Sequence, residues 1–172
     1  MASVLKVDTL QKPDGTAPTA ADLGIDVADT VVKVGSYKFS GQQYITSTSN
    51  VAITDSSFSY TPKGVGNKLI ITPTVHCNIN DTANAAGAGL YVYINGVQQN
   101  YDVNHSMYFN GGNNSTTDFY WMYTQPIYYT TVGTSPITIQ LYAAMYQSDD
   151  NRIAINNGSN QESYITVYEI AQ

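Results

Sequence analysis

The sequence predicts an all-β fold, an antiparallel β-sandwich or jelly roll, and three observations support this prediction. Charged residues make up 12% of the 172 residues, about half of the ~25% that is usual in soluble domains. The low charge is combined with abundant Tyr, Thr, Asn and Gly, and Tyr alone contributes 15 residues, which favours strands over helices. From residue 31 onward apolar and polar residues alternate with a period of two, and no amphipathic helix longer than one turn is visible.

About nine or ten short strands are expected, each ending at polar residues, Gly or Pro. The most apolar is 68–78 (KLIITPTVHCN), where Pro73 indicates a bulge or an edge position, because proline cannot donate to a strand ladder. Asn95-Gly96 is the strongest short hairpin signal. Residues 79–88 and 104–118 are expected to be loops. The expected strands cover residues 31–40, 42–48, 57–61, 68–78, 89–94, 97–103, 119–131, 136–146, 152–156 and 163–170.

Residues 1–30 differ in composition from the rest of the chain. They hold five of the thirteen acidic residues and no aromatic residue. The stretch 4–10 (VLKVDTL) predicts a short strand, and the PDG at 13–15 predicts a turn. A capping-box pattern followed by Gly at 19–24 predicts one helical turn. The chain is therefore divided into an N-terminal arm, 1–30, and a head domain, 31–172.

The charge pattern argues against two classes of partner. The net charge is -6, and no Lys or Arg occurs between Lys68 and Arg152. Nucleic-acid binding needs a basic stripe that neutralises phosphates, so no nucleic-acid partner is expected. The same reasoning disfavours an anionic membrane surface. Because eighteen consecutive apolar residues occur nowhere, no membrane insertion is expected.

Cysteine usage indicates a protein made in a reducing compartment. Cys77 is the only cysteine, so neither a disulfide framework nor a cysteine-rich metal site is expected. Secreted domains of this size usually carry pairs of cysteines, which favours synthesis in a cytoplasm. The N-terminus lacks the apolar run of a signal peptide.

The sequence predicts no enzyme, and no cofactor. His76 and Cys77 are neighbours on a predicted strand, so their side chains point to opposite faces and cannot form a nucleophile–base pair. A buried neutral histidine and a buried free thiol are expected instead. His105 lies in or near a loop, with no serine elbow beside it. Two acids that flank a cleft, as glycoside hydrolysis requires, cannot be placed.

A calcium site is the one metal site that the acids suggest. Asp149-Asp150-Asn151 could offer oxygen ligands, together with Asp81 or Asp118. Their spacing does not match a calcium-binding loop, so a solvated turn is the favoured interpretation and no metal is expected.

Several strands carry a second face that is rich in Tyr where charged residues would be expected. Tyr is enriched at protein interfaces because its ring buries area while its hydroxyl keeps a hydrogen-bond partner. One alternative is a partly wet face with high strand propensity, and another is a sugar-stacking platform that includes Trp121. The favoured interpretation is a subunit interface, a trimer interface built by one sheet, from Tyr91, Tyr93, Tyr142, Tyr146, Tyr164 and Tyr168.

Three stretches of the chain carry a family resemblance. ASVLKVDTLQKPDGTAPTAADLGI is similar to the N-termini of virion structural proteins from tailed phages, especially those of marine and cyanobacterial hosts. FSYTPKGVGNKLIITPTV resembles the opening of their C1q- and tumour-necrosis-factor-like jelly rolls. SPITIQLYAAM, RIAIN and SYITVYEIAQ resemble the terminal strands of that domain. The resemblance implies a jelly-roll protomer that forms a homotrimer, with its C-terminal strand near the threefold axis.

The expected function is therefore a phage virion structural protein, a short fibre, appendage or decoration protein, assembled in the host cytoplasm and located in the virion. Its partners would be itself and other virion proteins of the capsid, neck or tail. The arm would add its strand to a partner's sheet edge, through Leu5, Val7, Thr9 and Leu10. A disordered tail with no role is the alternative for the arm.

Two other functions are weighed against this one. The first is a carbohydrate-binding adhesin that recognises host surface polysaccharide through its long loops. In such a loop Tyr108 or Phe109 would supply a stacking face, and Asn113 and Asn114 would bind neutral sugar hydroxyls. The second is a polysaccharide-degrading tailspike, which the missing acid pair and the short chain disfavour.

Overall fold

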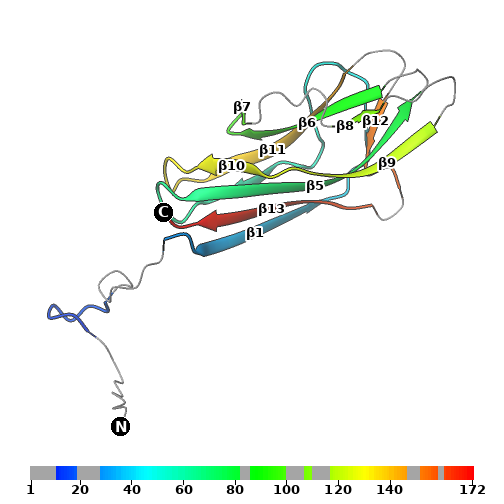
Figure 1. Cartoon of the computed structure of the whole chain (residues 1–172). Coiled ribbons are helices and arrows are strands. Elements are labelled where there is room, and N and C mark those ends of the chain that lie inside the picture. Colours follow the sequence, from blue (N-terminus) through cyan, green and yellow to red (C-terminus); the bar gives the residue numbers. More distant parts are fainter. Residues whose placement is uncertain are drawn as a thin grey trace, which may run out of the picture.

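The computed structural model describes residues 11–18, 28–81, 86–99, 107–109, 117–146, 152–158 and 161–172 (Figure 1). Within these residues the chain forms thirteen strands in two antiparallel sheets. The predicted all-β sandwich is therefore confirmed. Nothing in these residues forms a helix long and apolar enough to cross a membrane.

The first sheet has seven strands, in the order β1-β13-β5-β12-β2, with β9 and β10 also paired to β5. Its strands are β1 (Val31–Phe39), β2 (Gln43–Ile45), β5 (Lys68–Asp81), β9 (Thr117–Thr124), β10 (Ile127–Thr130), β12 (Arg152–Ile155) and β13 (Ser163–Ile170). The second sheet has six strands, in the order β3-β11-β6-β7, with β4 on β11 and β8 on β6. These are β3 (Val51–Ala52), β4 (Phe58–Tyr60), β6 (Ala86–Ile94), β7 (Val97–Gln98), β8 (Met107–Phe109) and β11 (Ile137–Met145).

Many of these strands lie end to end along one neighbour. Along β5, for example, β13 pairs with residues 68–74 and β12 with residues 77–80, while β10 and β9 follow each other on the opposite side. Joining strands in this way gives eight ribbons: β1/β2, β3/β4, β5, β6, β7/β8, β9/β10, β11 and β12/β13. Numbered along the chain, the ribbons run 1-8-3-6 in the first sheet and 2-7-4-5 in the second.

One strand predicted as continuous is divided into two strands in the structure, and the division lies beside Pro73. Residues 119–131 were expected to be continuous, but the structure separates β9 from β10 at Gln125-Pro126. Pro73 lies in β5 where its neighbour changes from β10 to β9, and the Thr124 hydroxyl donates to the Pro73 carbonyl at 2.9 Å. A proline has no N–H for the ladder, so this is where a neighbouring strand can break with least loss.

Both predicted turns that fall within the described residues are confirmed. Asn95 and Gly96 have φ values of 50° and 78°, the left-handed pair that a type I′ hairpin requires. At the other turn, the Gly15 N–H donates to the Lys12 carbonyl at 2.9 Å, and Asp14 Oδ1 accepts from the Thr16 N–H. The predicted strand 4–10 and helical turn 19–24 lie outside the described residues.

The core lies between the two sheets and consists mainly of aliphatic side chains. On β5, Leu69, Ile71 and Val75 alternate inward, and β11 and β13 contribute inward rows in the same way. Each such side chain contributes roughly 1.5–3 kcal/mol of burial free energy. The sandwich therefore leaves the two outer faces, the strand edges and the two ends as places where function can lie.

Candidate functional site

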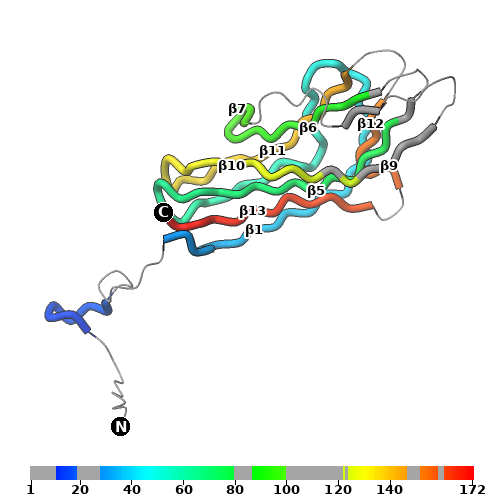
Figure 2. The backbone as a smooth tube through the Cα atoms, in the orientation of Figure 1, coloured from blue at the N-terminus to red at the C-terminus, as the bar shows by residue number. Residues whose placement is uncertain are grey.

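The chain enters and leaves the sandwich at the same end. The Asp29 N–H donates to the Ala171 carbonyl at 2.9 Å, and the Ala171 N–H donates to the Thr30 carbonyl at 3.0 Å. Figure 2 shows the start of β1 and the end of β13 side by side at this end. At the opposite end β5 finishes, and β6 and β9 begin (Figure 1). These are called the arm end and the far end. The two ends of the head therefore lie at the arm end, and the last residues of β5 and the first residues of β6 and β9 lie at the far end.

A buried carboxylate fixes the arm end. Glu169, on β13, is fully buried. Its Oε1 accepts hydrogen bonds from the Lys63 N–H at 2.7 Å, the Gly64 N–H at 3.1 Å and Asn67 Nδ2 at 2.8 Å. Its Oε2 accepts from the Tyr60 hydroxyl at 2.9 Å. One side chain thus holds the 63–67 loop and β4 against the last strand.

The surroundings of Glu169 keep it ionised. Burial raises the pKa of its carboxyl, but the hydrogen bonds from Asn67, Tyr60 and the two backbone N–H groups outweigh burial, so the pKa lies below its ordinary value. Burial and the bond to Glu169 raise the pKa of Tyr60, whose hydroxyl stays protonated and donates. Lys33 Nζ lies 4.4 Å from the centre of the Tyr60 ring. The network has a structural role, because all four hydrogen-bond donors to the carboxylate belong to the protein itself.

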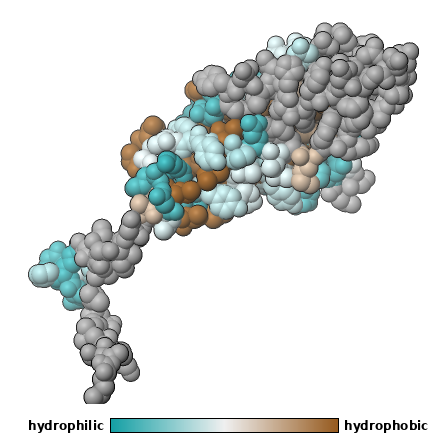
Figure 3. All heavy atoms as spheres, in the orientation of Figure 1, coloured by the Kyte–Doolittle hydropathy of each residue, from teal (hydrophilic) through white to brown (hydrophobic). Residues whose placement is uncertain are grey.

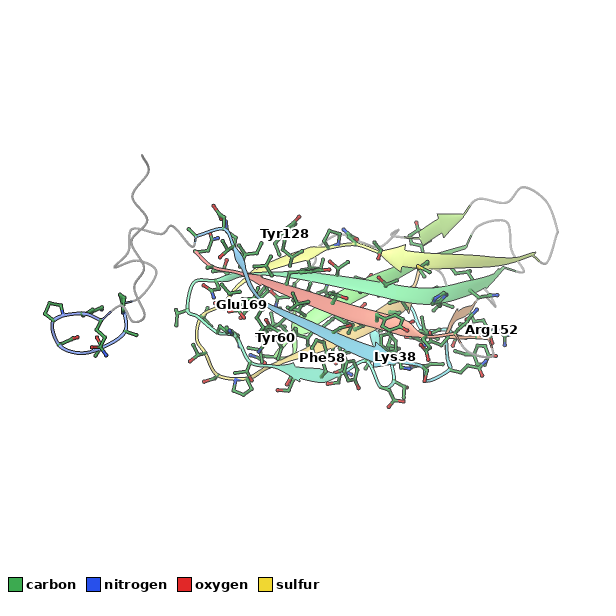
Figure 4. All side chains as sticks on the ribbon, turned by 90° about the horizontal axis from the view of Figure 1, so that it is seen from below. Lys38, Phe58, Tyr60, Tyr128, Arg152 and Glu169 are labelled. Atoms are coloured by element: carbon green, nitrogen blue, oxygen red, sulfur yellow. The ribbon has the colours of Figure 1, made fainter. Side chains whose placement is uncertain are left out.

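A row of exposed apolar side chains crosses the outer face of the first sheet near the arm end. Register places Val34, Tyr168, Ile70 and Tyr128 directly opposite one another on β1, β13, β5 and β10. Val34 is 56% exposed, Tyr168 40% and Tyr128 70%. Hydrophobic atoms gather over the described part of the head next to the arm (Figure 3), and Tyr128 is labelled at that end in Figure 4. We call these four residues the apolar row.

The residues around the apolar row carry little charge. The next row toward the far end is Ser36, Thr166 and Thr72, all neutral. Beyond it, Lys38 Nζ and Glu162 Oε1 form an ion pair at 2.8 Å, so their charges offset each other. The Lys38–Glu162 bond lowers the pKa of Glu162 and raises that of Lys38. On the arm side the next row is Ile170, Lys68 and Thr130, in which Lys68 is an exposed cation. This face therefore combines exposed apolar area with few charges, and none of the described acids on it is unpaired.

The predicted interface tyrosines do not lie on one sheet, and that part of the prediction is wrong. Tyr164 and Tyr168 belong to β13 in the first sheet, whereas Tyr91, Tyr93 and Tyr142 belong to β6 and β11 in the second, and Tyr146 follows β11. Both groups alternate with inward core residues. They therefore lie on opposite outer faces of the sandwich. The period-two pattern identified outward positions correctly, but it contains no information about which sheet a strand joins.

The second-sheet tyrosines interact mainly with one another and with neighbouring amides. The Tyr93 and Tyr142 rings lie 4.0 Å apart between centroids. The Tyr93 hydroxyl accepts from Asn50 Nδ2 at 2.8 Å. Tyr91 is almost fully buried, and burial raises the pKa of its hydroxyl. Some of the ring surface and hydrogen-bonding groups of this face are therefore already in contact within one protomer.

Other predicted site residues have mixed outcomes. Tyr108 and Phe109 were predicted to lie in a loop, which is wrong, because they lie on β8 and pair with β6. Outside the described residues lie Leu5, Val7, Thr9, Leu10, Asn113 and Asn114, together with His105 and the 149–151 turn. Cys77 is buried, as expected, and burial raises the pKa of its thiol. His76 is only partly buried, against expectation, because alternation places it on the outer face. In the described part of the chain no three His, Cys, Asp or Glu side chains group as metal ligands would.

No protein-family model matches the chain, and no curated protein sequence matches it. Among solved structures, it is similar to a mutant VP2 protein of infectious bursal disease virus in T=1 particles, with 16% identity and a TM-score of 0.40 over 83% of this chain and 38% of that one. It is also similar to dimeric latent PorU from Porphyromonas gingivalis, with 9% identity and a TM-score of 0.38 over 84% and 13%. A further similar structure is a VP2 subviral particle of infectious bursal disease virus, with 16% identity and a TM-score of 0.38 over 84% of this chain and 39% of that one. The chain spans less than half the length of these proteins, and no function is assigned from such remote likenesses.

Proposed function

We propose that this protein is a non-enzymatic structural component of a virion, in which the arm attaches to another virion protein and the head projects as a self-associated jelly roll. The observation that carries the proposal is that the head has two distinct ends, and the arm joins it at one of them. Asp29 and Ala171 pair at the arm end, so a particle bound there leaves the far end outermost. The sequence resemblance of the arm to phage virion proteins supports the same orientation.

The ribbon order supports the jelly-roll assignment. Eight antiparallel ribbons form two sheets, in the orders 1-8-3-6 and 2-7-4-5. Ribbon 1 therefore lies next to 8, 2 next to 7, 3 next to 6 and 4 next to 5, which is the strand order of a jelly roll. Such double Greek-key sheets are common in viral structural proteins and lectins. The fold alone does not assign the function, and the arm supplies the more specific argument.

Self-association is proposed through the apolar row. A contiguous exposed apolar patch indicates an interaction surface, and three of the four side chains are at least two-fifths exposed. The chain carries a net charge of -6, so a face without unpaired acids is the one on which two copies can meet with least repulsion. The trimer that the family resemblance implies is the expected assembly.

Sedimentation tests this part of the proposal. The full chain is expected to sediment as a trimer, and Tyr168→Glu or Tyr128→Glu to sediment as a folded monomer, because each places a charge in the apolar row. Tyr142→Glu makes the same chemical change on the other sheet and should leave the assembly intact. A monomeric wild-type protein, or dissociation by Tyr142→Glu alone, would show that the row is not the interface.

A further inference from the structure

A compact polar and aromatic cluster lies at the far end, outside the surfaces described above. Tyr44, on β2, is 49% exposed. The Arg152 guanidinium lies 4.5 Å from the centre of its ring. The Tyr44 hydroxyl donates to Asn157 Oδ1 at 2.7 Å and accepts from Gln42 Nε2 at 2.7 Å. Gln42 Nε2 also donates to Asn157 Oδ1. The ring is therefore held at its tip and on one face before any ligand arrives.

Among the described residues, Arg152 has no acid paired with it. It is the only Lys or Arg after Lys68 in the whole sequence. Figure 4 places it at the opposite end of the sandwich from Glu169. Its side chain packs against the Tyr44 ring. A planar guanidinium stacked on an aromatic ring keeps its N–H fork free for bidentate contact with a carboxylate.

Two amide side chains lie beside this pair. Register places Tyr44 opposite Ala154 on β12, and Gln42 and Asn157 both contact the Tyr44 hydroxyl. Gln42 Oε1 and Asn157 Nδ2 have no hydrogen-bond partner within the described residues, so both can bind a ligand hydroxyl.

We propose that Tyr44, Arg152, Gln42 and Asn157 form a binding site for an acidic saccharide. The Arg152 fork binds the sugar carboxylate, the exposed part of the Tyr44 ring packs against an apolar sugar face, and the amides bind hydroxyls. A phosphate polymer is disfavoured because one cation in a chain of net charge -6 cannot neutralise a run of phosphates. The site goes beyond the proposed structural role and is independent of where the protein is located.

Calorimetric titration of the full chain with three probes, each with one carboxylate, tests the site: galacturonate, mannuronate and sialyllactose. At least one is expected to bind, and its methyl ester to bind at least about tenfold more weakly, because the ester removes the charge that Arg152 recognises. Arg152→Gln should remove this preference. Arg152→Lys should retain part of it, since Lys keeps the charge but loses the fork. Tyr44→Ala should weaken both acid and ester by about tenfold.

Lys68→Gln is the matched control, because it removes one cation from the arm end of the same sheet and should leave binding unchanged. All of these substitutions are at exposed side chains, so thermal melting should show folded proteins. The proposal is overturned if none of the probes binds at about 10 mM, or if acid and ester bind equally. It is also overturned if Arg152→Gln changes binding no more than Lys68→Gln does.

Discussion

Replacing Glu169 by Gln is expected to lower the free energy of unfolding by about 3 kcal/mol, because four donors that now face a carboxylate would face an amide with one acceptor. If the Gln amide nitrogen faced Lys63 and Gly64, it would meet two N–H groups that can only donate. If it faced Tyr60, the hydroxyl would have to accept instead of donating, and the remaining bonds would lose the charge of the carboxylate. For a chain of this length the melting temperature should fall by roughly 6–12 °C. Glu162→Gln is the control, since Glu162 is an exposed acid in a surface ion pair and should change the melting temperature far less.

The same carboxylate predicts how stability depends on pH. The pKa of Glu169 is lower in the folded protein than its ordinary value, so its contribution is complete above the unfolded value of ~4.3. The contribution is then lost as the pH falls through the folded-state pKa. The difference in melting temperature between wild type and Glu169→Gln should therefore be constant above about pH 5 and narrow below about pH 4. A difference in melting temperature that is unchanged down to pH 3 would contradict the conclusion that Glu169 is ionised in the folded protein.

Deleting residues 1–27 is expected to abolish incorporation into virions while the head remains folded. The deletion keeps Asp29 and Thr30, which pair with Ala171. The deleted residues that the structure describes, 11–18, contribute nothing to the hydrophobic core. The melting temperature should stay within a few degrees of the full chain. Incorporation is measured by the amount of the protein in gradient-purified particles that carry the deletion.

A finer version of this experiment tests the attachment residues. If 4–10 adds as a strand, Leu5, Val7 and Thr9 share one face and Lys6 lies on the other. The double substitution Leu5→Asp and Val7→Asp should then prevent incorporation, and Lys6→Gln should not. Particles that incorporate the truncated chain normally would show that the arm is not the anchor.

The strands and turns could be predicted because they depend on local chemistry. Period-two alternation identified most of the strands, and Asn95-Gly96 has the left-handed pair that only a few residue types adopt readily. The break between β9 and β10 was missed, although Pro73 and Pro126 both signal an interruption. Their effect depends on lying near each other across the sheet, which a single sequence does not show.

The candidate surfaces were harder to predict because they depend on long-range pairing. Tyr142 and Tyr168 have the same local pattern, yet they face opposite sides of the sandwich because β11 and β13 join different sheets. Glu169 could have been found, since Ile165 and Val167 place it on the inward face. The grouping of Arg152 with Tyr44 could not, because β2 and β12 are more than a hundred residues apart.

The central claim, a structural role in a virion, is tested most directly by the protein content of purified virus particles. Quantitative mass spectrometry of density-gradient fractions should find the chain in a constant ratio to the major capsid protein across the particle peak. A chain that is abundant in the infected-cell lysate but absent from the particle fractions would contradict the proposed role.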